Sequence, residues 1–229
     1  IQTLLYGGLE SIAYNRNRKH KNLRLYEFGN CYNFNSEKKN DNNILAEYKE
    51  DTRIALWICG KTTRKNWAAS EMNSSVFELK AAVENILKRI GIGSRQVVFE
   101  KLTSPIYSSG MTIRTHKREI GSFGIISKKV LKEFDIDTDV YYAEMRRDIL
   151  MKESESHATK FSEISKFPAV SRDLALLIDN NINFSEIEQV AQKSERKLLK
   201  NITLFDVYEG KNLPEGKKSY AVNFMLQDE

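Results

Sequence analysis

The sequence contains few cysteines and histidines, which argues against a metal centre or a disulfide framework. Its 229 residues include two cysteines, Cys31 and Cys59, which lie in apolar stretches typical of strands and form no CxxC pair. His20, His116 and His157 each lack a Cys, Asp or Glu at the spacing of metal ligands. The sequence therefore predicts no metal site, and it favours a reducing compartment such as the cytoplasm.

Long apolar runs are also absent. No stretch of eighteen or more apolar residues occurs, so no membrane-spanning helix is predicted. The first residues, IQTLLYGGLE, lack the basic region and the cleavage site of a secretory signal, and they are more typical of the interior of a helix. With 41% hydrophobic and 29% charged residues, the chain is expected to be soluble and folded into one large domain or two modest ones.

The charge is only mildly positive, at +5. Residues 160–229 hold ten Lys or Arg and eleven Asp or Glu, so the surplus lies upstream, notably in NRNRKHK at 15–21. Cations at a helix C-terminus complement the helix dipole, so this run is interpreted first as structural and second as RNA-binding. If the last third binds nucleic acid, it must do so through local geometry rather than a broad positive field.

Hydrophobic periodicity predicts a mixed α+β protein. Leu5, Leu9, Ile12 and Ala13 share one face of a predicted helix over 3–19, and a second helix over 75–90 ends at Gly91. Further predicted elements are strands at 23–34, 53–60, 96–102, 111–126 and 139–145, and a short helix near 128–134. The polar stretch 151–163 has no apolar period and is interpreted as a linker.

The last third has the order β-α-β-β, which is the first part of a ferredoxin-like split βαβ unit without its final helix and strand. The pattern predicts strands at 171–178, 201–210 and 217–226, and a helix over 184–200 opened by a capping box of Ser185 and Glu188. Leu204, Asp206 and Tyr208 are expected on one face of their strand, and Phe205 and Val207 on the other.

This alternation predicts an open sheet face suited to an unpaired base. Small residues let a base approach, tyrosine offers a stacking plane, and Asp and Ser can hydrogen-bond a base edge. An ordinary solvated face is the alternative. The predicted face holds Ala175, Asp206, Tyr208, Ser219, Ala221 and Asn223, with Arg172, Lys217 and Lys218 near its edge as possible contacts to the RNA backbone.

One apparent phosphate-binding motif is rejected. ALWICGKTT at 55–63 ends like a P-loop in Gly60, Lys61 and Thr62, but its first glycine is Ala55 and its interior is strand-like.

Several stretches carry a family resemblance. SKFPAVSRDLALLI, followed by LFDVYEGKNLPEGKKSYAV, resembles the ferredoxin-fold anticodon-binding domain of the bacterial phenylalanyl-tRNA synthetase beta subunit. TLLYGGLESIAYNRNRK, LRLYEFGNCY, FELKAAVENIL, REIGSFGIIS and YYAEM resemble its catalytic-like module. The resemblance implies a class II synthetase-like antiparallel sheet domain at 1–152, a linker at 153–165, and a truncated anticodon-binding domain at 166–229.

The same resemblance implies an activity that belongs to a larger assembly. Two alpha and two beta subunits attach phenylalanine to tRNA(Phe) with ATP and magnesium, so the expected partners are the alpha subunit and tRNA(Phe), not DNA or a membrane. The class II signature, aromatic-Arg-x-Glu, corresponds here to Tyr32-Asn33-Phe34-Asn35, and Asn cannot supply the fork that binds a triphosphate. The GxGxGxxR signature is also absent, so the chain is expected to be non-catalytic and to hold no cofactor itself.

The family's anticodon contacts fall on Ala175, Asp206, Tyr208 and Ser219, where the family binds a guanine as the first anticodon base. Two alternatives stay open. The chain could be an active ligase, against which Asn33 and Asn35 argue, or a pure protein scaffold that does not touch RNA.

Overall fold

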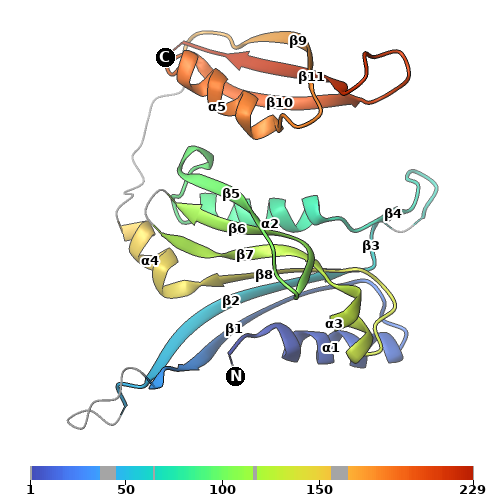
Figure 1. Cartoon of the computed structure of the whole chain (residues 1–229), viewed down its shortest axis with the longest axis vertical. Helices are drawn as coiled ribbons and strands as arrows, with labels where there is room; N and C mark the ends of the chain where they lie inside the picture. The colour runs from blue at the N-terminus through green and yellow to red at the C-terminus, as the bar shows by residue number, and fades with distance from the viewer. Residues whose placement is uncertain (1, 37–44, 64, 116–117, 156–164, 229) are drawn as a thin grey trace. The chain divides into compact units, whose positions relative to one another are not determined.

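The computed structural model describes residues 2–36, 45–63, 65–115, 118–155 and 165–228. The chain divides into two compact units, residues 1–159 and 160–229 (Figure 1). Both units combine antiparallel sheets with helices, so the predicted α+β class is confirmed. None of the helices in the described ranges is long and apolar enough to cross a membrane.

The first unit is built on a six-stranded antiparallel sheet in the order β1-β2-β8-β7-β6-β5. Its strands are β1 (Leu23–Phe34), β2 (Tyr48–Cys59), β5 (Val97–Leu102), β6 (Tyr107–Thr115), β7 (Glu119–Ile126) and β8 (Val140–Arg146). A small hairpin is formed by β3 (Lys61–Thr63) and β4 (Met72–Asn73). The P-loop-like stretch therefore lies mostly inside β2, as the sequence predicted.

Helices cover both faces of this sheet. On one face, α1 (Leu5–Asn17) and α3 (Lys128–Glu133) contribute Leu9 and Leu131 to the core. On the other, α2 (Val76–Arg89) and α4 (Arg147–Glu155) contribute Leu79 and Leu150. α2 ends as predicted before Gly91, whose φ of 88° favours glycine. A short 3-10 helix, η2 (Ser94–Gln96), leads into β5.

Gly8 lets α1 approach the sheet closely. A Cβ on Gly8 would clash with the Trp57 ring, so only glycine fits at this point of the helix. Trp57 is 1% exposed and packs at a tilt on Tyr142, with ring centroids 5.3 Å apart. This face of the sheet is consequently filled by aromatic side chains beneath α1.

A carboxylate at the edge of this core holds the start of α1. Glu144 accepts hydrogen bonds from the Leu4 amide at 2.8 Å and the Thr3 hydroxyl at 3.0 Å. Arg53 neutralises it, with Nη1 2.6 Å from Oε2, and both side chains are largely buried. The pair thus joins β2, β8 and the N-terminal end of α1.

Buried phenols make the first unit sensitive to alkaline pH. Burial raises the pKa of Tyr107 to about 12, partly opposed by its hydrogen bond with Ser122, and burial also raises the pKa of Tyr142. Unfolded tyrosines ionise near pH 10, whereas the folded phenol must stay neutral, so its contribution to stability is complete below pH 10 and is lost between about pH 10 and 12.

We therefore expect the free energy of unfolding of this unit to fall by up to about 3 kcal/mol per buried phenol across that range. Urea unfolding followed by tryptophan fluorescence tests this, because both tryptophans lie in the first unit. Tyr107→Phe should flatten the alkaline decline, and a decline identical to that of the parent chain would contradict the assignment.

The second unit is a three-stranded antiparallel sheet in the order β10-β11-β9, with one helix (Figure 1). Its elements are β9 (Val170–Asp179), α5 (Phe184–Ser194), β10 (Leu199–Tyr208) and β11 (Lys217–Leu226). The Phe184 and Tyr220 rings are 6.4 Å apart, so α5 covers the face that carries Tyr220. The predicted β-α-β-β order is found.

Two local predictions for the helix of the second unit were wrong. The helix cap is Asn183 with Glu186, whose carboxylate accepts from the Asn183 amide at 2.8 Å, rather than Ser185 with Glu188. The helix also ends at Ser194 instead of 200, because Glu195 accepts from the Lys197 and Leu198 amides and turns the chain into β10. In the expected linker, residues 153–155 belong to α4, and 156–164 lie outside the described residues.

Candidate nucleic-acid interface

The three strands of the second unit align their side chains in rows. Residues paired across antiparallel strands share a face, so the register identifies each row. One row is Asp206–Ala221–Ala175 and the next is Tyr208–Ser219–Leu177. The adjoining row Thr203–Asn223–Asp173 and the cross-strand pair Lys217–Asp179 lie on the same side of the sheet. We call the surface formed by these rows and this pair the open face, because α5 covers the opposite side.

The four residues predicted from the sequence as base contacts thus lie on one face. Asp206 and Ala175 flank Ala221, and Tyr208 is the cross-strand partner of Ser219. Asp206 and Ala175 are exposed and Ser219 is half-buried, while 44% of Tyr208 is accessible. Methyl groups at 175 and 221 leave a shallow floor between the carboxylate and the phenol, where a planar base can approach.

The polar atoms in the rows of Asp206 and Tyr208 are positioned by local contacts. One carboxylate oxygen of Asp206, Oδ1, accepts from the Val207 amide at 2.9 Å, which fixes the side chain. Each carboxylate oxygen has two lone pairs, so both oxygens can still accept from a ligand. The Tyr208 ring lies against Gly210, where an added Cβ would fall 2.5 Å from the phenol oxygen. Glycine at 210 therefore allows the ring to lie close to the turn after β10.

The third row of the open face is polar and held together by hydrogen bonds. Asn223 donates to Ser171 at 2.5 Å and to Asp173 at 2.6 Å, and so links β11 to β9. Thr203 lies directly opposite Asn223 on β10. The sequence placed Asn223 on this face but missed Thr203, because strict alternation does not include the irregularity between Leu204 and Asp206.

That irregularity corrects the prediction for Leu204. Strict alternation put Leu204 beside Asp206, whereas the register pairs it with Val222, which is fully buried on the α5 side. Phe205 is the additional residue between the paired positions 204 and 206. A β-bulge of this kind inverts the alternation on one side of it, so Asp206 and Tyr208 reach the open face while Leu204 does not.

The basic residues proposed for the RNA backbone are separated by the structure. Lys218 is 6% exposed, donates to the Asn180 carbonyl at 3.0 Å and lies 4.8 Å from the Tyr220 ring centroid, so the prediction of an RNA contact there is wrong. Arg172 pairs in register with Phe224, on the α5 side rather than on the open face. Lys217 does share the open face, and its Nζ lies 2.6 Å from Asp179.

The geometry leaves the open face without an excess of positive charge. Its acidic groups Asp173, Asp179 and Asp206 outnumber Lys217, which is itself paired with Asp179. In the described part of the chain, no cluster of three or more His, Cys, Asp or Glu side chains could hold a metal ion. The face is thus suited to recognition of a base edge rather than to strong attraction of phosphates.

Two family profiles match the chain, one for each unit. Residues 2–146 match the profile described as the phenylalanyl tRNA synthetase beta chain CLM domain. Residues 165–229 match the ferredoxin-fold anticodon binding domain.

Curated relatives agree with these matches over the whole chain. The phenylalanine–tRNA ligase beta subunit of Bacteroides fragilis is 54% identical over 229 residues, which is 100% of this chain and 28% of the relative. The corresponding subunit of Porphyromonas gingivalis is 46% identical with the same coverage. The chain therefore spans little more than a quarter of the length of these relatives.

Among solved structures, the pyrrolysyl tRNA synthetase of Desulfitobacterium hafniense is similar over 69% of this chain and 51% of its own. The TM-score is 0.48 and the identity 16%, a likeness too weak to support any inference about this chain.

Proposed function

The chain belongs to the phenylalanyl-tRNA synthetase beta chain family, and from this membership we propose that it acts within a phenylalanine–tRNA ligase as a non-catalytic element. In this proposal the first unit supports the alpha subunit, and the second recognises the anticodon of tRNA(Phe). The assembled enzyme, in the cytoplasm, uses ATP and magnesium to attach the amino acid.

The open face is the observation that carries the proposed RNA recognition. Its carboxylate at 206 can accept from the N1–H and N2–H₂ edge of guanine, which adenine and the pyrimidines do not present in the same way. The phenol of Tyr208 and the hydroxyl of Ser219, in the adjacent row, provide a stacking plane and a polar group. A guanine lying over Ala221 would meet all three residues.

The first unit does not fit a triphosphate or magnesium at the position of the class II signature. The Asn33 side-chain amide, through Nδ2, donates to Asp51 Oδ2 at 3.4 Å, and Asp51 is 4% exposed. Burial opposes the ionisation of Asp51, but the hydrogen bond and charge of Lys49 outweigh it, so the pKa of the carboxyl lies below its ordinary value. An ionised carboxylate beside Asn33 would repel a phosphate, so we assign ATP and magnesium to the assembled enzyme alone.

Binding of an anticodon stem-loop to the 229-residue chain tests the proposed RNA recognition. We expect a loop with guanine as its first anticodon base to bind more tightly than the same loop with adenine, by about 5- to 100-fold. Fluorescence anisotropy at one fixed salt concentration measures both affinities. Equal binding of the two loops would count against recognition of the base. Binding of neither loop would favour the alternative of a protein scaffold without RNA contact.

A further inference from the structure

The basic run at residues 15–21 of the first unit separates into two parts in the structure. Its two arginines have structural partners. Arg16 forms an ion pair with Asp137, and Arg18 lies over the Tyr14 ring and donates to the Tyr14 carbonyl at 3.1 Å. These contacts hold the last turn of α1, in agreement with the structural interpretation of the run.

The other basic side chains of the run have no such role. Lys19, His20 and Lys21 are exposed, and within the described residues their side chains form no ion pair or hydrogen bond. They are not needed to cap α1 either, because the backbone amides of residues 18–20 already donate to its last carbonyls. Three adjacent basic groups are thus left available for a ligand.

These groups border a polar pocket with a volume of 870 Å³. It lies where the end of α1, the turn between β2 and β3, and the segment between α3 and β8 meet (Figure 1). Small-molecule sites typically have a volume of about 300–1,000 Å³. The pocket is separate from the position of the class II signature, since β1 begins at the pocket with Leu23 and reaches Asn33 only near its other end.

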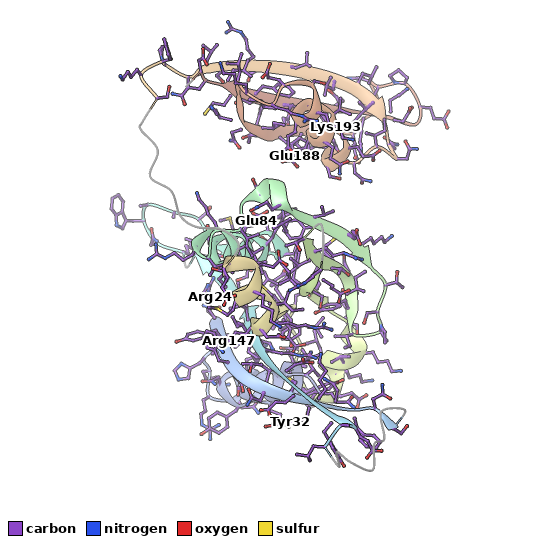
Figure 2. The ribbon with its side chains drawn as sticks, turned by 90° about the vertical axis from the view of Figure 1, so that its left-hand side faces the viewer. Arg24, Tyr32, Glu84, Arg147, Glu188 and Lys193 are labelled. Carbon is purple, nitrogen blue, oxygen red and sulfur yellow. The ribbon has the colours of Figure 1, made fainter. Side chains whose placement is uncertain are left out.

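The segment that carries the basic groups is fixed against the sheet. A Cβ on Gly60 would lie 2.3 Å from the Lys21 carbonyl oxygen, so glycine allows this close contact. Asn22 Oδ1 accepts from the Lys61 amide at 2.9 Å. Arg24, labelled in Figure 2, donates through Nη2 to the Lys61 carbonyl at 3.3 Å. One wall of the pocket is therefore held in place by contacts within the protein.

A buried phenol without a partner also lines the pocket. Tyr141 is 9% exposed, and its hydroxyl makes no hydrogen bond among the residues that the structure describes. Such groups are rare, because a hydrogen bond left unmade in a buried position costs free energy. Burial and, to a lesser extent, the charge of Asp139 raise the pKa of Tyr141, so the phenol stays protonated and can donate.

The charges of the described lining residues favour an anion. Arg16 neutralises Asp137, and Lys61 is paired with Glu71 at 2.5 Å. The basic side chains of residues 19–21 then outnumber the remaining acid of the lining. An anionic group is consequently attracted to this side of the first unit.

We propose that this pocket binds a nucleotide, with its phosphate at Lys19, His20 and Lys21. Cationic side chains form strong, charge-assisted hydrogen bonds with phosphate oxygens. The sugar or base contacts Asp139 and Tyr141, where the carboxylate accepts from a hydroxyl or amino group and the phenol donates. A free mononucleotide and a nucleotide within an RNA strand share this chemistry.

Titrations of the 229-residue chain test the pocket. The probes are the four nucleoside 5′-monophosphates, inorganic phosphate, and a short single-stranded RNA without guanine. Backbone amide chemical shifts of Lys21, Asn22 and Gly60 should change, and at least one monophosphate should bind about 5-fold or more tightly than inorganic phosphate, which cannot reach Tyr141 at the same time. Tighter binding of the RNA than of any monophosphate assigns the pocket to an RNA strand, and the reverse assigns it to a free nucleotide.

Variants with matched charge separate the pocket from a general positive field. Lys21→Ala should weaken binding of the monophosphate about 10-fold or more, because it removes a charge-assisted contact. Arg18→Ala removes a charge from the same run but outside the lining, and it should change the affinity by less than about 2-fold. Tyr141→Phe should weaken binding of the monophosphate and leave that of inorganic phosphate unchanged.

Three results would overturn the proposal. They are no change at the pocket with any probe, inorganic phosphate binding as tightly as every nucleotide, and equal losses in Lys21→Ala and Arg18→Ala. Both of these positions are exposed, so the comparison stands even if Tyr141→Phe does not fold. Asp206→Ala, in the second unit, should not alter these titrations, which distinguishes a failure of this proposal from a failure of anticodon recognition.

Discussion

Replacing Asp206 with alanine is expected to weaken binding of the guanine-containing stem-loop by about 1–3 kcal/mol, the usual value of a bidentate contact to a base edge. The adenine loop should lose little, because it cannot use the carboxylate in the same way. Titration of both loops at one salt concentration measures the difference. The alanine variant removes both the proposed base acceptor and the hydrogen bond to the Val207 amide.

Two further variants separate base recognition from local structure. Asp206→Asn keeps an oxygen for the Val207 amide but offers guanine a donor in place of an acceptor, so it should lose nearly as much affinity as alanine. Glu209→Ala, an exposed site just beyond β10, makes the same change in charge and should leave the guanine preference intact. Equal losses for the two loops in Asp206→Ala would count against recognition of the base.

Removal of Arg53 is the second change with a large expected effect. Arg53→Met leaves the Glu144 carboxylate largely buried without its cation, and we expect the first unit to lose about 3–5 kcal/mol of unfolding free energy. Chemical denaturation followed by tryptophan fluorescence reports this unit alone, since Trp57 and Trp67 both belong to it.

The double variant Arg53→Met/Glu144→Gln isolates the uncompensated charge. Glutamine retains an oxygen for the Leu4 amide but carries no charge, so the double variant should recover much of the lost stability. Lys80→Met breaks the exposed pair with Glu84 and should cost about 0.5 kcal/mol or less. If Arg53→Met resembled Lys80→Met, the buried pair would not support the first unit as described.

Hydrophobic periodicity predicted the helices and strands of this fold. It was less reliable for the face on which a side chain lies where an additional residue in a strand changes the register. Strand alternation placed Asp206, Tyr208 and Ser219 together, as the structure does. It placed Leu204 on the wrong face, because a bulge at Phe205 leaves no local signal in a strand of mostly apolar residues. The sequence also did not predict that the Lys218 ammonium is buried. It donates to the Asn180 carbonyl, which lies near it only in the folded sheet.

The exposed aromatic residues of β1, among them Tyr26 and Phe28, show a further limit of what the sequence predicts. The residue pattern of β1 predicts a strand, and large side chains occur on both of its faces. Whether Tyr26 and Phe28 are covered depends on how far α2 reaches over the sheet, and this is decided by packing between elements distant in the chain. A pattern of alternation identifies two faces but not the neighbours of each.

The most direct test of base recognition by the second unit is a map of backbone amide chemical shifts during titration with the guanine stem-loop. The proposal predicts the largest changes at Ala175, Asp206, Ser219 and Ala221, with Glu186 and Val190 of α5 little affected. Changes concentrated on α5, or confined to the first unit, would contradict it.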